Sequence, residues 1–270
     1  MIDLASGAAC ARELSAVGSL IGSLEIIAGR RHYATGGIFS QRVFTTRSAV
    51  LADARVAPFA GALFSAPGVV RMHLVKAAAA ALLIVPGFDP AVYAAALALT
   101  LLLHCLWVYR TVAGADGSDQ MLTVVTAGLL VYFLAPHELA GTIGLAFIAA
   151  QALLAYTAAG VSKLLSPVWR SGRALRLIFG TASYGSERLL RVLEAAPVLD
   201  RIGGWATIVF ECTLPAAILL PPDGALALLG LGVAFHAACA LTMGLNGFFW
   251  QFVATYPVIA AFSGRLIPPF

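Results

Sequence analysis

The chain has 270 residues, of which 60% are hydrophobic and only 11% are charged. Its net charge is +4 and its mean hydropathy is +0.91. A soluble globular domain carries about 25% charged residues, so this composition excludes an ordinary soluble fold. Because the apolar residues come in long runs with few charges, the chain is predicted to be an integral membrane protein. Its first partner is the lipid bilayer, and no nucleic-acid partner is expected.

Eight apolar segments approach the length of about 20 helical residues that a bilayer core requires. In chain order they are residues 13–29, 67–86, 90–112, 120–136, 138–164, 204–221, 224–243 and 246–263. Since backbone polar groups cannot remain unpaired in lipid, every segment is predicted to be a helix. The expected fold is therefore all-α, a polytopic transmembrane bundle of about eight spans in which residues 1–270 form a single domain.

Two arginine-rich stretches, residues 30–66 and 165–203, lie between these segments and are not expected to cross the membrane. Within the second, residues 186–194 have helical periodicity with three leucines on one face, which is typical of a helix lying in the interface plane. Basic residues concentrate in the loops after the first, third and fifth segments, so the positive-inside rule predicts that these loops are cytoplasmic. A long basic stretch that is held at the membrane surface for function weakens that rule.

Ionisable side chains inside apolar segments are the first candidates for function, because each is costly in lipid. Glu211 lies in the middle of its segment and needs a partner, for which His236 in the next segment is expected; structural pairing and proton handling both remain open. Lys76 is either deep or extended toward the basic face, and the extended form costs less. His104 is expected to be satisfied within its own helix. No CxxC pair or soluble-enzyme motif is present, so no metal site is predicted.

A lysine-containing pattern spans the end of the fifth segment and the residues after it. From Tyr156 the chain reads Y-x-x-A-G-V-x-K-L-x(4)-W-x-x-G-x-x-L, in which the lysine is Lys163 and the tryptophan is Trp169. The pattern resembles the signature of the horizontally transferred transmembrane (HTTM) domain. That domain is the membrane part of vitamin K-dependent γ-glutamyl carboxylase and of many bacterial relatives.

Other pieces of the chain follow the order of this family. Residues 33–40 are similar to its glycine loop, and Arg110 with residues 117–122 is similar to the R…GGDxLL segment of its bacterial members. Glu211 and His236 resemble positions in its closing spans. The resemblance therefore extends over nearly the whole chain.

The resemblance implies that Lys163 is a base linked to the deprotonation of a reduced lipid quinone, with Asp119, Glu211 and His236 as supporting polar groups. Desolvation at a membrane edge disfavours the charged form of a lysine, which makes a free amine accessible. A lipid-soluble quinol can reach such a lysine sideways from the bilayer. The groups expected to contact the substrate are Tyr156, Gly160, Trp169 and Arg110.

Two hypotheses about function remain open. One is a carboxylase-like or oxidative membrane enzyme that acts in the maturation of a secreted peptide. The other is a non-catalytic scaffold that binds a partner membrane protein, a redox protein or a lipid. The enzyme is the first hypothesis, and two departures from the family pattern speak for the scaffold: Asp119 or a neighbour stands where the carboxylase has a functional histidine, and no β-rich soluble region follows. Transport is a third hypothesis. It has less support, because the sequence shows no inverted repeat of the kind found in many transporters.

The orientation and the compartment follow from the resemblance as well. The expected location is the bacterial cytoplasmic membrane, and the resemblance places Lys163 on its outer face. This orientation is opposite to the one that the basic loops predict. We prefer the family orientation, because long amphipathic loops weaken the charge rule.

Overall fold

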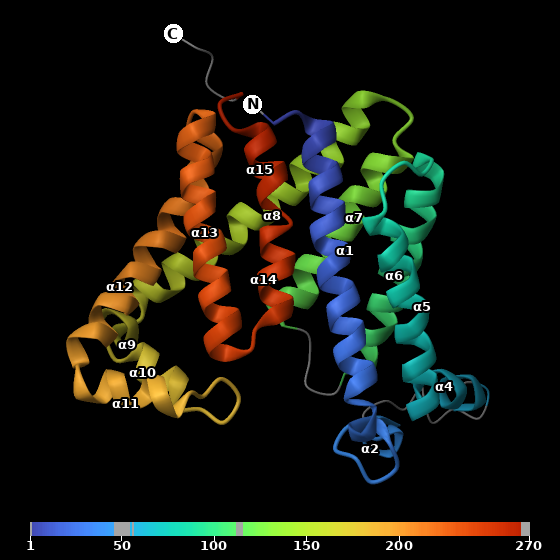
Figure 1. The fold of residues 1–270 in the computed structure, drawn as a ribbon, viewed down its shortest axis with the longest axis horizontal. Helices are drawn as coiled ribbons and strands as arrows, with labels where there is room; N and C mark the ends of the chain where they lie inside the picture. Colours follow the sequence, from blue (N-terminus) through green and yellow to red (C-terminus); the bar gives the residue numbers. More distant parts are fainter. Residues whose placement is uncertain (1, 46–54, 56, 112–115, 266–270) are drawn as a thin grey trace. The chain divides into compact units, whose positions relative to one another are not determined.

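The computed structural model describes residues 2–45, 55, 57–111 and 116–265, and their regular structure is helical throughout (Figure 1). Six helices are long and apolar enough to cross a membrane. They are α5 (Ala66–Ile84), α6 (Pro90–Arg110), α7 (Gly117–Leu134), α8 (Glu138–Leu165), α12 (Pro197–Thr213) with its 3-10 continuation η2 (Leu214–Leu219), and α13 (Pro222–Met243). The all-α prediction is confirmed, and these helices indicate a multi-span membrane protein.

The first and the last of the eight expected spans differ from these six. Helix α1 (Leu4–Ala28) begins well before residue 13 and carries Arg12, Glu13 and Glu25, so it is long but less apolar. The last segment is divided into α14 (Asn246–Val253) and α15 (Tyr256–Phe262). Pro257 lies in the first turn of α15, where its missing N–H group is tolerated but could not continue a helix from α14. That these two segments also cross the membrane remains a prediction.

The ends of the apolar helices follow from local sequence chemistry. Three side chains accept hydrogen bonds from backbone N–H groups of the first helical turn: Ser65 for α5, Asp89 for α6 and Asp116 for α7. Helix α13 ends at Gly244, whose φ of +73° lies in the left-handed region that glycine adopts without steric cost. These four boundaries are therefore set by local caps rather than by hydropathy alone.

The contacts divide the chain into two compact units, which are described separately. The N-terminal unit is Arg12–Gly144, and the C-terminal unit is Met1–Ala11 with Leu145–Phe270. In the N-terminal unit α5 packs against α6, and α6 against α7 (Figure 1). Ile26 of α1 packs against a buried cluster of α5 and α6 residues that includes Trp107. At its other end the α1 residue Arg12 lies over the ring of Tyr93 in α6. Helix α1 therefore contacts this bundle at two distant levels.

In the C-terminal unit, three short helices gather beside the N-terminal half of α12: α9 (Pro167–Arg170), α10 (Ala174–Phe179) and α11 (Glu187–Ala195) (Figure 1). In α11 Leu193 is buried while the charged side chains are exposed, so the predicted amphipathic helix is confirmed. Buried Asp200 of α12 accepts hydrogen bonds from the backbone N–H groups of Leu175 and Arg176. This carboxylate fixes the start of α10 on α12.

Candidate functional site

The candidate site in the C-terminal unit begins with a close approach of α8 and α12. A Cβ atom placed on Gly160 would lie 2.8 Å from both the backbone N and the Sγ of Cys212, far inside ordinary contact distance. Only glycine therefore allows the two helices to come this close. The approach brings the last turn of α8, with Lys163, alongside Glu211 in the last turn of α12.

Lys163 and Glu211 form an ion pair at this crossing. Lys163 Nζ donates to both carboxylate oxygens of Glu211, at 2.8 Å from Oε1 and 2.6 Å from Oε2. The lysine side chain is 22% exposed and the glutamate side chain only 8%. The same Nζ lies 5.2 Å from the ring centroid of Trp169 in α9, a cation–π distance. The prediction that His236 is the partner of Glu211 is wrong, because the glycine crossing offers the carboxylate a nearer cation.

The pair can hold its proton in two arrangements with the same net charge. In one, an ammonium faces a carboxylate; in the other, an amine faces a carboxylic acid. The second arrangement provides the free amine that a general base needs, while Glu211 keeps the proton within hydrogen-bond reach. An accessible lysine backed by a buried carboxylate is therefore suited to proton transfer with a substrate that approaches the lysine side.

His236 belongs to a separate buried network in the same unit. The Tyr156 hydroxyl is hydrogen-bonded to His236 Nε2 and lies 2.6 Å from the hydroxyl of Tyr256. The imidazole also stacks on Phe252 with ring centroids 5.0 Å apart. Its Nδ1 atom is buried and has no hydrogen-bond partner among the described residues. Tyr156 is only 3% exposed, so it is an interior residue, and its contact with a substrate remains a prediction.

Asp119 lies in the N-terminal unit, at the start of α7. Its carboxylate accepts a hydrogen bond from the backbone N–H of Asp116 and thereby completes a capping box. Its backbone carbonyl accepts from His104 Nε2 at 2.9 Å, and Lys76 Nζ lies 3.3 Å from His104 Nδ1. Lys76 is only 5% exposed. The prediction that its side chain extends toward the basic face is therefore wrong. Nor is His104 satisfied within its own helix, since its bonds reach α5 and α7.

Arg110 is fully buried and holds two other parts of the N-terminal unit together. Its guanidinium donates to the backbone carbonyl of Phe64 at 3.1 Å and to that of Phe39 at 2.6 Å. Phe64 ends α4 (Ala57–Phe64), and Phe39 lies in the glycine loop. Arg110 therefore shapes this region through backbone contacts, and direct contact with a substrate remains a prediction.

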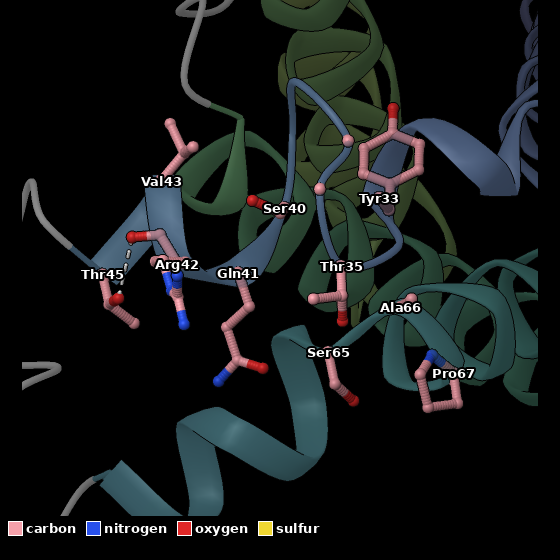
Figure 2. Close-up of a pocket in the computed structure, with 12 residues that line it drawn as sticks. Tyr33, Thr35, Ser40, Gln41, Arg42, Val43, Thr45, Ser65, Ala66 and Pro67 are labelled. Atoms are coloured by element: carbon pink, nitrogen blue, oxygen red, sulfur yellow. Dashed lines mark hydrogen bonds between the residues drawn. The ribbon is translucent and has the colours of Figure 1, made fainter.

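A hollow of about 700 Å³ lies between the glycine loop, α2 (Gln41–Thr45) and the start of α5. Figure 2 shows the polar side chains of Thr35, Gln41 and Ser65 around this space. Tyr33, which ends the 3-10 helix η1 (Arg30–Tyr33), also lines it. Burial raises the pKa of the Tyr33 hydroxyl, although nearby Arg110 acts in the opposite direction. Tyr33 therefore stays neutral at physiological pH.

Several polar residues of these sites were not expected from the sequence. Tyr256 was not singled out, because a tyrosine in an apolar segment carries no distinctive pattern. Lys76 and His104 were each assigned an ordinary role, although they lie in consecutive segments near the same end of the bundle. Two ionisable residues at matching depths in neighbouring spans can reach each other, and this pattern could have predicted their contact.

Comparison with known proteins adds no further constraint: no protein-family model, no curated protein and no solved structure matches this chain.

Proposed function

We propose that this protein is an HTTM-like membrane enzyme in which Lys163 and Glu211 act together as an acid–base pair on a lipid-soluble substrate. The observation that carries the proposal is the ion pair of a partly exposed lysine with a nearly buried glutamate at the Gly160 crossing. Ionisable residues in membrane spans are costly and are retained mainly where they function. The lysine pattern that carries the family resemblance contains Gly160, Lys163 and Trp169, which all take part in this arrangement.

A reduced quinone fits the chemistry of this position. Val161 and Leu164 next to the lysine are exposed apolar residues, so a hydrophobic ring can approach from the lipid side. Trp169 offers an aromatic face beside the ammonium group. A bound quinol would supply a weakly acidic O–H group. Lys163 in its amine form would take that proton while Glu211 keeps its own, and the resulting ammonium would face the negatively charged oxygen left on the quinol.

The finer predictions about topology and biology belong to the same proposal. Helix α1 and the pair α14–α15 would complete eight spans, in the cytoplasmic membrane of a bacterium. Lys163 would face outward, where a secreted peptide could be the final substrate. Each of these statements rests on the family resemblance.

The test is mass spectrometry of lipids and quinones that co-purify with the full chain in detergent. Wild type is compared with Lys163→Ala and with Arg170→Ala, which removes an exposed cation close to Trp169 and outside the ion pair. We expect a quinone in the wild type and in Arg170→Ala, and its loss from Lys163→Ala. Equal quinone content in all three proteins would remove Lys163 from the proposed site.

A non-catalytic scaffold is the second candidate, and one observation favours it. Both oxygens of Glu211 are occupied by Lys163, which is also the arrangement of an ion pair that only clamps two helices. A scaffold would carry ordinary phospholipid in every variant and no quinone. In that case the next experiment would be a search for a protein that co-purifies with the wild type in its native membrane.

A further inference from the structure

The interior of the N-terminal unit contains a set of buried polar side chains, called here the polar seam. Each of its members is at most 5% exposed. They are Arg12, Ser15, Ser19 and Ser23 of α1, His73 and Lys76 of α5, Thr100 and His104 of α6, and Thr126 of α7. Four helices therefore turn polar groups toward one interior in a bundle that is otherwise apolar.

The polar seam extends along about half of the length of the bundle. At one end Arg12 lies 3.9 Å from the ring centroid of Tyr93, whose hydroxyl donates to the carbonyl of Val85 at the turn between α5 and α6. At the other end His104 is bonded to Asp119 in the first turn of α7. From Tyr93 to His104 the α6 helix rises about 16 Å, more than half of a bilayer core of about 30 Å. The two ends lie near opposite ends of the apolar helices.

Several atoms of the polar seam are buried and have no hydrogen-bond partner among the described residues. They are Arg12 Nε, Ser19 Oγ, Ser23 Oγ, Thr100 Oγ1 and both ring nitrogens of His73. Buried polar groups in proteins are nearly always bonded, and a bilayer offers no solvent to exposed ones. Such a concentration of unpaired donors and acceptors indicates that small polar molecules occupy the interior.

Simple helix packing does not account for these hydroxyl groups. A serine or threonine used only as a small packing residue bonds back to a carbonyl of its own helix. Thr123 and Thr157 do so, each to the carbonyl four residues earlier. Ser19, Ser23 and Thr100 make no such bond. Their hydroxyl groups instead remain available to a partner inside the polar seam.

Space for such a partner exists at the level of Thr100. A small cavity of about 10 Å³ is lined by five polar residues and five apolar residues; the polar ones are Arg12, Ser15, Ser19, Thr100 and Thr126. This volume is close to the smallest that holds one water molecule, and the polar members of the lining can supply the two to four partners that a buried water needs. Water is therefore the ligand that matches both the size and the chemistry.

The other half of the polar seam holds groups that bind and release protons. Because the Asp119 carbonyl can only accept, His104 Nε2 carries a proton, and His104 Nδ1 accepts from Lys76 Nζ. The Asp119 carboxylate lies 3.9 Å from the same Nε2 atom. His73 lies on the same face of α5, one turn before Lys76. An amine, two imidazoles and a carboxylate thus lead toward the start of α7.

We propose that the polar seam is a water-filled path that conducts protons along the N-terminal unit, between its Arg12–Tyr93 end and its Asp119 end. Protons enter and leave as such, so no oxidant, reductant or second substrate is required. Hydroxyl groups and trapped water carry the proton through the Thr100 level, and Lys76 with His104 carries it to Asp119. This activity involves neither Lys163 nor a quinone, and so is independent of the proposed enzyme.

The test is proton flux in liposomes that contain the purified full chain and a trapped pH-sensitive dye. A potassium diffusion potential set with valinomycin drives protons inward. We expect wild-type flux about tenfold above protein-free liposomes, and a loss of about tenfold in Thr100→Val, since one missing hydroxyl leaves a gap in the chain. Lys76→Met should lose flux to a similar degree.

Matched controls separate the polar seam from general damage. Thr157→Val removes an exposed hydroxyl from α8, and Arg71→Met removes an exposed cation from α5; both should conduct like the wild type. Thermal unfolding and gel-filtration elution of each variant confirm that it is folded, and Thr100→Val preserves side-chain shape. Wild-type flux at the level of protein-free liposomes would overturn the proposal. So would wild-type rates in folded Thr100→Val and Lys76→Met.

Discussion

Replacing Lys163 with methionine removes the only cation seen bonded to the Glu211 carboxylate in the described structure. The Glu211 side chain is 8% exposed, so neither solvent nor another bonded cation compensates for the loss. Glu211→Leu has a milder consequence, because Lys163 is 22% exposed and can turn its ammonium group outward. The two single variants should therefore differ in stability, with Lys163→Met the less stable.

The magnitude follows from the burial of the pair. Removing one partner of a fully buried ion pair costs about 3–5 kcal/mol, and partial exposure of Lys163 reduces this to about 2 kcal/mol for Lys163→Met. Replacing both partners with apolar residues of similar volume is often neutral, so Lys163→Met/Glu211→Leu should lie within about 1 kcal/mol of the wild type. The resulting interaction energy of the double-mutant cycle is about 1–3 kcal/mol.

The assay is unfolding of the four proteins in mixed micelles of mild detergent and SDS, followed by circular dichroism and by tryptophan fluorescence. Arg170→Met is the matched control, since it removes an exposed cation near the pair and should change stability by less than about 0.5 kcal/mol. Additive single effects, with an interaction energy below about 0.5 kcal/mol, would refute the claim that this pair holds α8 against α12.

Two further predictions concern packing inside the units, one in each unit. Gly160→Ala should lower stability by about 1–3 kcal/mol, because its Cβ would meet the α12 backbone. Gly230→Ala, where nothing lies within 4 Å, should be neutral or slightly stabilising in the same unfolding assay, and equal effects would contradict the close crossing. Arg110→Met should release the carbonyl groups of Phe39 and Phe64. Limited proteolysis should then cut the glycine loop faster than in the wild type, and an unchanged rate would argue against this clamp.

The extent of the helices shows where sequence reasoning succeeded and where it failed. Hydropathy located six apolar helices, because a helix that crosses a bilayer needs a long apolar run regardless of its neighbours. It placed the start of the first segment at residue 13, whereas α1 begins at Leu4. Arg12 lies just before that expected start, yet in the structure it is buried over Tyr93 within the bundle. A charge marks a boundary only when no interior partner exists.

The candidate site was located from the sequence only in part. The lysine pattern singled out Lys163, and the apolar setting of Glu211 predicted that it needs a partner. The sequence argument chose His236 because it lies in the next segment, yet the partner is 48 positions away from Glu211 along the chain. Which helices cross, and at which residue, depends on close approach at Gly160. That approach is a property of packing and leaves no trace in hydropathy.

By itself the sequence determined that this protein is an α-helical membrane protein. Its composition and its long apolar runs require a bilayer and helices, whatever the tertiary contacts. It also predicted that Glu211, in the middle of an apolar segment, needs a partner. Only the tertiary structure decided how the cost of burying ionisable groups is met: Lys163 by Glu211, Lys76 by His104, and Arg110 by two carbonyl groups. Pairing depends on the depth of two side chains in the bundle and on the directions in which they point. Both are set only when the helices pack.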